Sequence, residues 1–236
     1  MKTRIICILI LIFLGSDLSA QYSKTVKNLP QYDNKLWHFG FTVGCNNMGF
    51  KIDRSDDFFA LEDMYGIEAE KFTGFHIGPI SSLRICKYLD LRMMFNLSFN
   101  QRDLVYYFME GDKTEMKNHR MSINSTMLEF PVLFKYKAER WGNFSPYLVA
   151  GANYKYDLAA DKKPRPEEMP KIKLLKHDPC AEWGAGFDIY LQYFKLSLEL
   201  KYSVGLLNTL KRDNTPYTDC INKLSSNALI FSIHFE

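Results

Sequence analysis

Most of the chain alternates between apolar and polar residues with a period of two, the pattern of β-strands with two unlike faces. It is clearest from Leu89 to Asn100, where Leu, Met and Phe alternate with Asp, Arg, Ser and Asn. It recurs at 39–46, 128–137, 181–192, 196–206 and 229–236, and less regularly at 72–84 and 146–158. The pattern therefore predicts eight strands, most of them near the ten or so residues that cross a bilayer at a tilt.

The segments between the predicted strands alternate in length. Long segments lie at 47–71, 102–120, 160–179 and 208–226, and short ones lie at 86–88, 140–143 and 193–194. This alternation is typical of outer-membrane barrels, which have short periplasmic turns and long outer loops. We therefore predict an all-β fold: an eight-stranded antiparallel transmembrane β-barrel with both chain ends in the periplasm. An even number of strands closes such a barrel and leaves no edges.

The first twenty residues have the features of a secretory signal. Lys2 and Arg4 precede an unbroken apolar run at 5–14, and Leu18-Ser19-Ala20 offers a small-residue cleavage site. The run is too short for a transmembrane helix, which needs roughly 20 apolar residues. We predict a signal peptide at 1–20, a periplasmic N-terminal segment at 21–35 and the barrel at 36–236, located in the bacterial outer membrane.

Alternation alone does not say which face points outward, since a soluble lipocalin-like barrel also alternates with its apolar face inward. Three features favour the membrane barrel. The polar face is rich in Gly and Ser, which suits a narrow interior, and it carries charges of both signs. Aromatic residues lie near strand ends, as interface girdles require. These are Trp37, Tyr88, Trp141, Tyr147 and Tyr193 on one side, and Tyr106, Tyr154 and Tyr156 on the other.

A barrel with its apolar face outward predicts which residues line the lumen and which residues face lipid. The charged residues expected in the lumen are Arg92, Glu129, Lys135, Glu182, Asp188, Glu199 and Lys201. The residues expected to face lipid are Phe95, Phe134, Leu198 and Phe231. Unpaired charge is costly in a narrow interior, so we expect the lumen residues to form a connected network. Such a network would also block ions, because it fills the space that water would need.

The chain shows no motif that carries chemistry. It has no Gly-rich phosphate loop, no Gly-x-Ser-x-Gly elbow and no His-Glu-x-x-His helix, so no catalytic residue, metal ligand or cofactor is predicted. The net charge of +3 gives little support for nucleic-acid binding. A small-molecule substrate is not expected. Two alternatives remain: a soluble barrel binding an apolar ligand, and an enzyme at the outer rim. The rim candidates are Asp56, Asp57, Asp103, His119, His177 and Asp178.

Two further groups of residues stay open. Cys45, Cys86, Cys180 and Cys220 match no zinc spacing, and either isolated thiols or disulfides suit them. A basic run between 160 and 179 suits either a mobile loop or contact with lipopolysaccharide phosphates or an acidic partner. It contains Lys162, Lys163, Arg165, Lys171, Lys173 and Lys176.

A series of short segments, taken in order along the chain, forms a recognisable set. They are Phe39-Gly40-Phe41 with Gly44, Asn46 and Asn47, Gly74-Phe75-His76-Ile77-Gly78, Leu89-Asp90-Leu91-Arg92, Ser98 to Asp103, Glu129-Phe130-Pro131, Lys135-Tyr136-Lys137, Pro146-Tyr147-Leu148, Ala150-Gly151, Tyr156-Asp157-Leu158-Ala159, Gly184-Ala185-Gly186-Phe187-Asp188, Tyr193-Phe194-Lys195, Glu199-Leu200-Lys201-Tyr202 and His234-Phe235-Glu236. This ordered set resembles the PorT family of outer-membrane barrels, which is tied to the type IX secretion system of Gram-negative bacteria. The resemblance implies a non-enzymatic accessory or assembly role in protein secretion. The partners it implies are outer-membrane lipids and proteins of the secretion machine, and it supplies no catalytic residues.

Overall fold

The computed structural model describes residues 26–54, 64–110, 115–160, 172–211 and 220–236. The predicted signal peptide, Asp56, Asp57 and most of the basic run lie outside these residues. The elements are η1 (Tyr32–Asn34), β1 (Trp37–Arg54), β2 (Met64–Arg84), β3 (Leu89–Met94), β4 (Asn96–Glu110), β5 (Glu115–Lys137), β6 (Phe144–Asp157), β7 (His177–Tyr190), β8 (Lys195–Gly205) and β9 (Ile221–Phe235). Among the described residues, no helix is long and apolar enough to span a bilayer.

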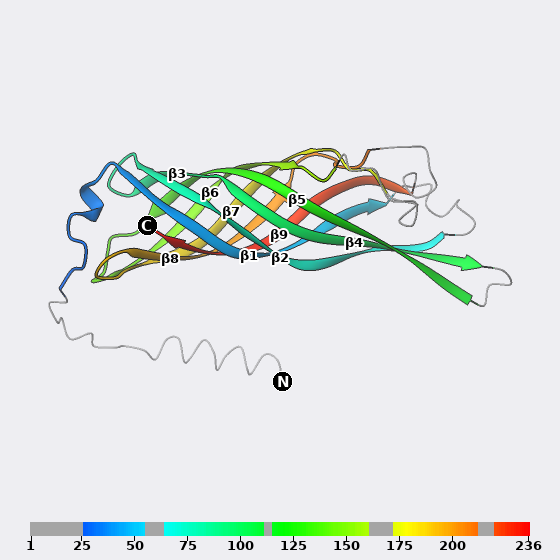
Figure 1. The fold of residues 1–236 in the computed structure, drawn as a ribbon, viewed down its shortest axis with the longest axis horizontal. Coiled ribbons are helices and arrows are strands. Elements are labelled where there is room, and N and C mark those ends of the chain that lie inside the picture. Colours follow the sequence, from blue (N-terminus) through cyan, green and yellow to red (C-terminus); the bar gives the residue numbers. More distant parts are fainter. Residues whose placement is uncertain (1–25, 55–63, 111–114, 161–171, 212–219) are drawn as a thin grey trace, which may run out of the picture.

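The strands form one closed antiparallel ring in which β9 pairs with β1 (Figure 1). β3 and β4 act as a single strand, since the register against β2 and the register against β5 both continue unchanged across the break between them. The break falls at Phe95, where that register places Pro79 of β2 opposite. Proline has no N–H, so one ladder hydrogen bond is missing, although the Phe95 N–H still donates to the Pro79 carbonyl at 3.2 Å. The ring therefore has eight strands, which confirms the predicted fold.

The two ends of the barrel differ. The connections at one end are short and cover 85–88, 138–143 and 191–194. The N-terminal segment with η1 and the end of β9 lie at this same end, on the left in Figure 1. Short turns mark the periplasmic side of outer-membrane barrels, so this end faces the periplasm and the opposite end faces outward.

The strands extend further outward than the sequence pattern predicted. β1 continues to Arg54 and β2 begins at Met64, within the expected connection at 47–71. The prediction of a long connection at 102–120 was wrong, because only 111–114 separates β4 from β5. Figure 1 shows this hairpin projecting beyond the other strands at the outer end.

The outer parts of the strands were not predicted from the sequence because their pattern is inverted: polar residues point outward there and apolar residues point inward. In β5, the outward residues Leu128 and Phe134 are apolar and the inward residue Lys135 is buried and charged. Nearer the outer end, the exposed outward residue Asn124 is polar and the buried inward residue Ile123 is apolar. The first arrangement suits lipid outside the wall, and the second suits water. The inversion therefore marks where β5 leaves the membrane.

Inward apolar side chains make a core at the outer end of the barrel. It includes residues from β1, β2, β4, β5 and β9, together with Ile172, Leu174 and Leu210 from the connections between strands. The two connections are joined by a bridge between Leu174 and Leu210 and by a hydrogen bond from the Leu175 N–H to the Thr209 carbonyl at 2.8 Å. The members of this core are Phe50, Ile67, Leu104, Tyr106, Met121, Ile123, Ile172, Leu174, Leu210, Cys220, Ile221 and Leu224.

The inversion predicts that substitution by arginine has different effects on stability at two outward positions of the same strand. Phe134→Arg should lower the free energy of unfolding in lipid by about 2–4 kcal/mol, because the guanidinium would lie in the hydrocarbon. Asn124→Arg should leave it nearly unchanged, because that side chain lies in water. Reversible denaturant titration in lipid vesicles measures both values. Equal losses at the two positions would contradict the proposed boundary.

Candidate functional site

The polar faces of the strands meet inside the ring, where the structure places all seven residues predicted for the lumen. Each is at most 4% exposed, and Arg92 is completely buried. Glycines make room for the long side chains, because a Cβ on Gly186 would lie 2.6 Å from the Tyr147 hydroxyl oxygen. The interior is thus filled by charged and aromatic groups.

The centre of the lumen is organised around the carboxylate of Glu199 on β8. Arg92 Nη1 donates to Glu199 Oε2 at 2.6 Å, and the Tyr147 hydroxyl donates to the same oxygen at 3.0 Å. His234 Nε2 lies 3.4 Å and Lys201 Nζ 3.5 Å from Glu199 Oε1. Groups from β3, β6, β8 and β9 therefore converge on one carboxylate across the barrel.

Lys201 links this centre to a second carboxylate. Its Nζ lies 3.4 Å from Glu182 Oε2 on β7. Asn153 then donates to Glu182 Oε1 at 2.7 Å and to Glu129 Oε2 at 3.5 Å. Glu129 therefore joins the network through an amide. It is six residues from Lys135 on the same strand, roughly 20 Å along an extended chain, which is too far for direct contact.

Lys135 pairs instead with Asp188 on β7. Its Nζ lies 2.7 and 2.8 Å from the two carboxylate oxygens, and the Ser197 hydroxyl donates to Asp188 Oδ1 at 2.6 Å. The same ammonium lies 3.8 Å from the centre of the Tyr147 ring. Because Tyr147 also binds Glu199, this ring packs between the two ion pairs.

At the periplasmic end, Glu236 closes the network. Its carboxylate lies 2.5 Å from Lys195 Nζ and 3.4 Å from Arg92 Nη2, and it accepts a hydrogen bond from the Tyr32 hydroxyl at 2.9 Å. Burial raises the pKa of Tyr32, and the neighbouring Glu236 carboxylate raises it further. Tyr32 therefore stays neutral and serves as a hydrogen-bond donor at physiological pH.

The N-terminal segment that carries Tyr32 is fixed across the periplasmic mouth. Asn28 donates from its backbone to Asn143 at 2.9 Å and from its side chain to the Tyr190 carbonyl at 3.0 Å. Arg140 donates to the Asn28 carbonyl, and its guanidinium lies 3.7 Å from the centre of the Tyr190 ring. The described part of the predicted periplasmic segment thus forms a cap on the barrel.

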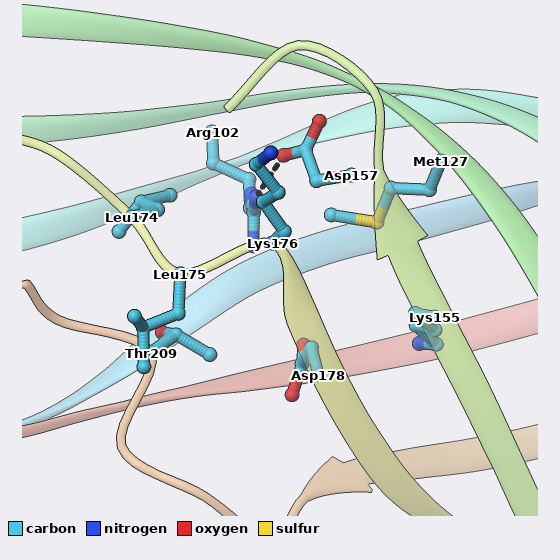
Figure 2. A pocket seen from close by; sticks show the side chains of 9 residues that line it. All are labelled: Arg102, Met127, Lys155, Asp157, Leu174, Leu175, Lys176, Asp178 and Thr209. Atoms are coloured by element: carbon cyan, nitrogen blue, oxygen red, sulfur yellow. Dashed lines mark ion pairs between the residues drawn. The ribbon is translucent and has the colours of Figure 1, made fainter. Parts of the chain in front are cut away.

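Toward the outer end, Arg102 forms the last polar layer. It donates to Ser125 at 2.7 Å and to Ser226 at 3.1 Å. Figure 2 shows its ion pair with Asp157, whose carboxylate lies 3.7 Å away. The cavity beside it measures about 10 Å³, close to the space that one water molecule needs. Its guanidinium also lies 4.4 Å from the centre of the Phe50 ring, where the outer apolar core begins. The lumen is therefore blocked at the cap, at the centre and at the outer end.

Several lumen residues were not predicted from the sequence, and two aromatic residues were predicted on the wrong face of the wall. Tyr147 and Tyr106 were expected in interface girdles, but they are 3% and 0% exposed and point inward. The alternation carried the signal for Tyr147, since its neighbour Leu148 belongs to the apolar side of the pattern at 146–158 and successive strand residues point to opposite faces. The missed charged residues include Asp90, Arg102, Lys155, Asp157, Asp178, Lys195 and Glu236.

The predicted lipid-facing residues lie on the outside of the wall. Phe95, Phe134 and Phe231 are 43%, 52% and 42% exposed, and Leu198 is half-buried. The other predicted girdle residues also lie on the outside of the barrel, at one end or the other: Trp37, Tyr88, Trp141, Tyr154, Tyr156 and Tyr193. A wall with its apolar face outward suits lipid and contradicts the soluble, lipocalin-like alternative.

Those rim residues considered for catalysis that the structure describes do not form one site. His177 is exposed and contacts the Tyr154 hydroxyl at 2.5 Å, whereas the next residue, Asp178, is buried in the lumen. Successive residues of a strand point to opposite faces, so this pair cannot act as one unit. Asp103 is paired with Arg120 at 3.1 Å. No group of three or more His, Cys, Asp or Glu residues suited to a metal occurs within the described ranges.

The four cysteines are separate thiols among the residues that the structure describes. Cys45 and Cys86 are exposed, and Cys180 and Cys220 are buried. Cys180 Sγ lies 3.5 Å from the Asp178 carbonyl. The alternative of isolated thiols, left open by the sequence, is therefore the arrangement in the structure.

The comparison with protein families agrees with this geometry. The family model described as "Outer membrane protein beta-barrel domain" matches residues 19–211. Among solved structures, the chain is similar to the outer membrane protein OprG from Pseudomonas aeruginosa, with 15% identity over 83% of this chain and 93% of that one and a TM-score of 0.46. It is also similar to Neisserial surface protein A, with 10% identity over 85% and 98% of the two chains and a TM-score of 0.40. No curated protein sequence matches.

The network predicts that Lys201→Met destabilises the barrel strongly. Methionine has similar length but no charge, so Glu182 and Glu199 would lose a shared buried cation. Removing one partner of a buried pair costs about 3–5 kcal/mol of unfolding free energy. Lys87→Met is the matched control, because Lys87 pairs with Glu139 at the exposed rim. Losses of equal size in the two variants, measured by denaturant titration, would contradict the network.

The blocked lumen predicts that the purified protein conducts no ions. In a planar bilayer, the wild-type barrel should show no steady current, because side chains fill the centre and both ends are covered. A known porin inserted by the same procedure supplies the control for insertion. Large, reproducible unit conductances from this protein would contradict the filled-lumen interpretation.

Proposed function

Because the chain belongs to the outer membrane protein beta-barrel domain family, we propose that it is a non-enzymatic, non-conducting barrel that acts as an accessory or assembly component of type IX protein secretion. The observation that carries this proposal is the lumen, which is filled from the periplasmic cap to the outer apolar core. A barrel with no path through it offers only its outer surfaces for function. The ordered segments that resemble the PorT family support the choice of secretion machine.

The outer β4–β5 hairpin offers a surface on which another protein can bind. From Asn118 to Ser125, β5 pairs with β4, but its pairing with β6 begins only at Met127. Within the described residues, this part of β5 thus has one side without a strand. An exposed sheet edge binds extended segments of other chains through backbone hydrogen bonds. We therefore infer that the partner contributes an extended segment along this edge.

A deletion experiment tests the function. Cells that lack this protein should fail to release proteins carrying the type IX export signal, and a plasmid copy of the wild-type gene should restore release. Other outer-membrane barrels should remain at normal levels in the deletion strain, which controls for a general assembly defect. Normal release of the exported proteins from deletion cells would overturn the proposal.

Site-specific photo-crosslinking tests the surface separately. A photoreactive residue at Asn124 on the open side of β5 should capture a component of the secretion machine, identified by mass spectrometry. The same residue at Phe134, which faces lipid on the same strand, should capture no protein. If the release of exported proteins depends on the barrel but the photoreactive residue at Asn124 captures nothing, the proposed docking surface is wrong and the proposed role in secretion is unaffected.

A further inference from the structure

The wall of the barrel has a notch at the periplasmic rim, between β1 and β8. β9 ends at Phe235, which pairs with Phe41, whereas β1 begins four residues earlier at Trp37. After β9, Glu236 is bonded to β8 instead: its N–H donates to the Lys195 carbonyl at 3.0 Å, and its carbonyl accepts from the Lys195 N–H at 2.7 Å. The first residues of β1 therefore have no strand beside them on that side among the described residues.

The notch is a hollow of about 390 Å³, which is within the size range of ligand pockets. Trp37 and Phe39 form one side, and Tyr193 and Phe194 of the β7–β8 turn form another. Tyr32 also lines it, and its ring stacks on His38 with 4.0 Å between centroids while its hydroxyl is bonded to Glu236. Tyr32, His38 and Glu236 are therefore held in place at the hollow by contacts of their own.

The aromatic walls of the notch continue the lipid-facing surface. Phe39 is 71% exposed, and its ring stacks with that of Trp37 at 6.1 Å between centroids. Phe194 lies 6.0 Å from Phe235, which in turn stacks on Phe41 at 4.7 Å. The medium against this surface is the bilayer, and the periplasmic rim lies at the level of the lipid headgroups. The molecule that reaches the notch is therefore a lipid of the periplasmic leaflet.

The charges around the notch suit a phosphate. Lys35 lines the hollow and is exposed, and no described carboxylate forms an ion pair with it. The nearby Glu236 carboxylate is neutralised by Lys195 and Arg92, so it does not oppose an anion. We propose that the notch binds one phospholipid of the periplasmic leaflet, with its phosphate at Lys35 and an acyl chain against Trp37 and Phe39. This binding does not depend on the proposed role in secretion.

Native mass spectrometry of the detergent-purified, full-length mature protein tests this site. After delipidation and addition of dioleoyl phosphatidylglycerol, the wild type should retain one lipid per barrel. Lys35→Gln should weaken retention roughly tenfold, because a charge-assisted contact to the phosphate is lost, and Lys35→Arg should preserve it. Dioleoylglycerol, which has no phosphate, should bind weakly and equally to the wild type and to Lys35→Gln.

Matched variants at the same rim separate the notch from general lipid adhesion. Trp37→Ala combined with Phe39→Ala should abolish retention, whereas Trp141→Ala and Lys87→Gln should retain lipid as the wild type does. Heat-modifiable migration on gels verifies that each variant is folded. Equal loss in the control variants, retention of no lipid by the wild type, or a peptide or second barrel bound in place of lipid would overturn the proposal.

Discussion

The structure depends on ion pairs between charged side chains inside the barrel, because the ring is too narrow for water to surround each charged group. Eight strands leave an interior only wide enough for side chains, so a buried guanidinium such as Arg92 must find its partners there. It finds them in Glu199 and Glu236, which lie on β8 and just after β9. Opposite sides of the wall are thus joined through the lumen, and the glycines on β7 supply the space for these long side chains.

The barrel meets three environments along its length, and the residues at each level reflect them. In the membrane, the wall is apolar outside and the interior is held by ion pairs. Beyond the membrane, the same strands carry polar groups outside and an apolar core inside, as soluble sheets do. At the periplasmic rim, aromatic rings and short turns meet the headgroups. One continuous sheet therefore joins a membrane wall to an outer part built like a soluble protein.

The alternation of apolar and polar residues was enough to predict the eight-stranded ring, the face of its wall that points outward and the seven buried charged residues. This is because the alternation is preserved wherever lipid lies outside the wall. The outer parts of the strands were not predicted, because there the apolar residues, such as Met121 and Ile123, point inward instead of outward. This reversal resembles the irregular pattern of a loop. The partners of each charge could not be predicted, since pairing across a lumen depends on strand register and shear. Lys135 thus meets Asp188, and the cap on the mouth left no signal beyond isolated polar residues such as Asn28.

The cap also joins the two strands at which the ring closes. Its partners are Asn143, Tyr190 and Glu236, which come from the turn before β6, the end of β7 and the residue after β9. These three groups lie on the run of neighbouring strands that ends with β9, whereas the segment that binds them leads directly into β1. A seated Tyr32 therefore bridges the seam between β9 and β1 from the periplasmic side, in addition to the backbone hydrogen bonds that close the ring.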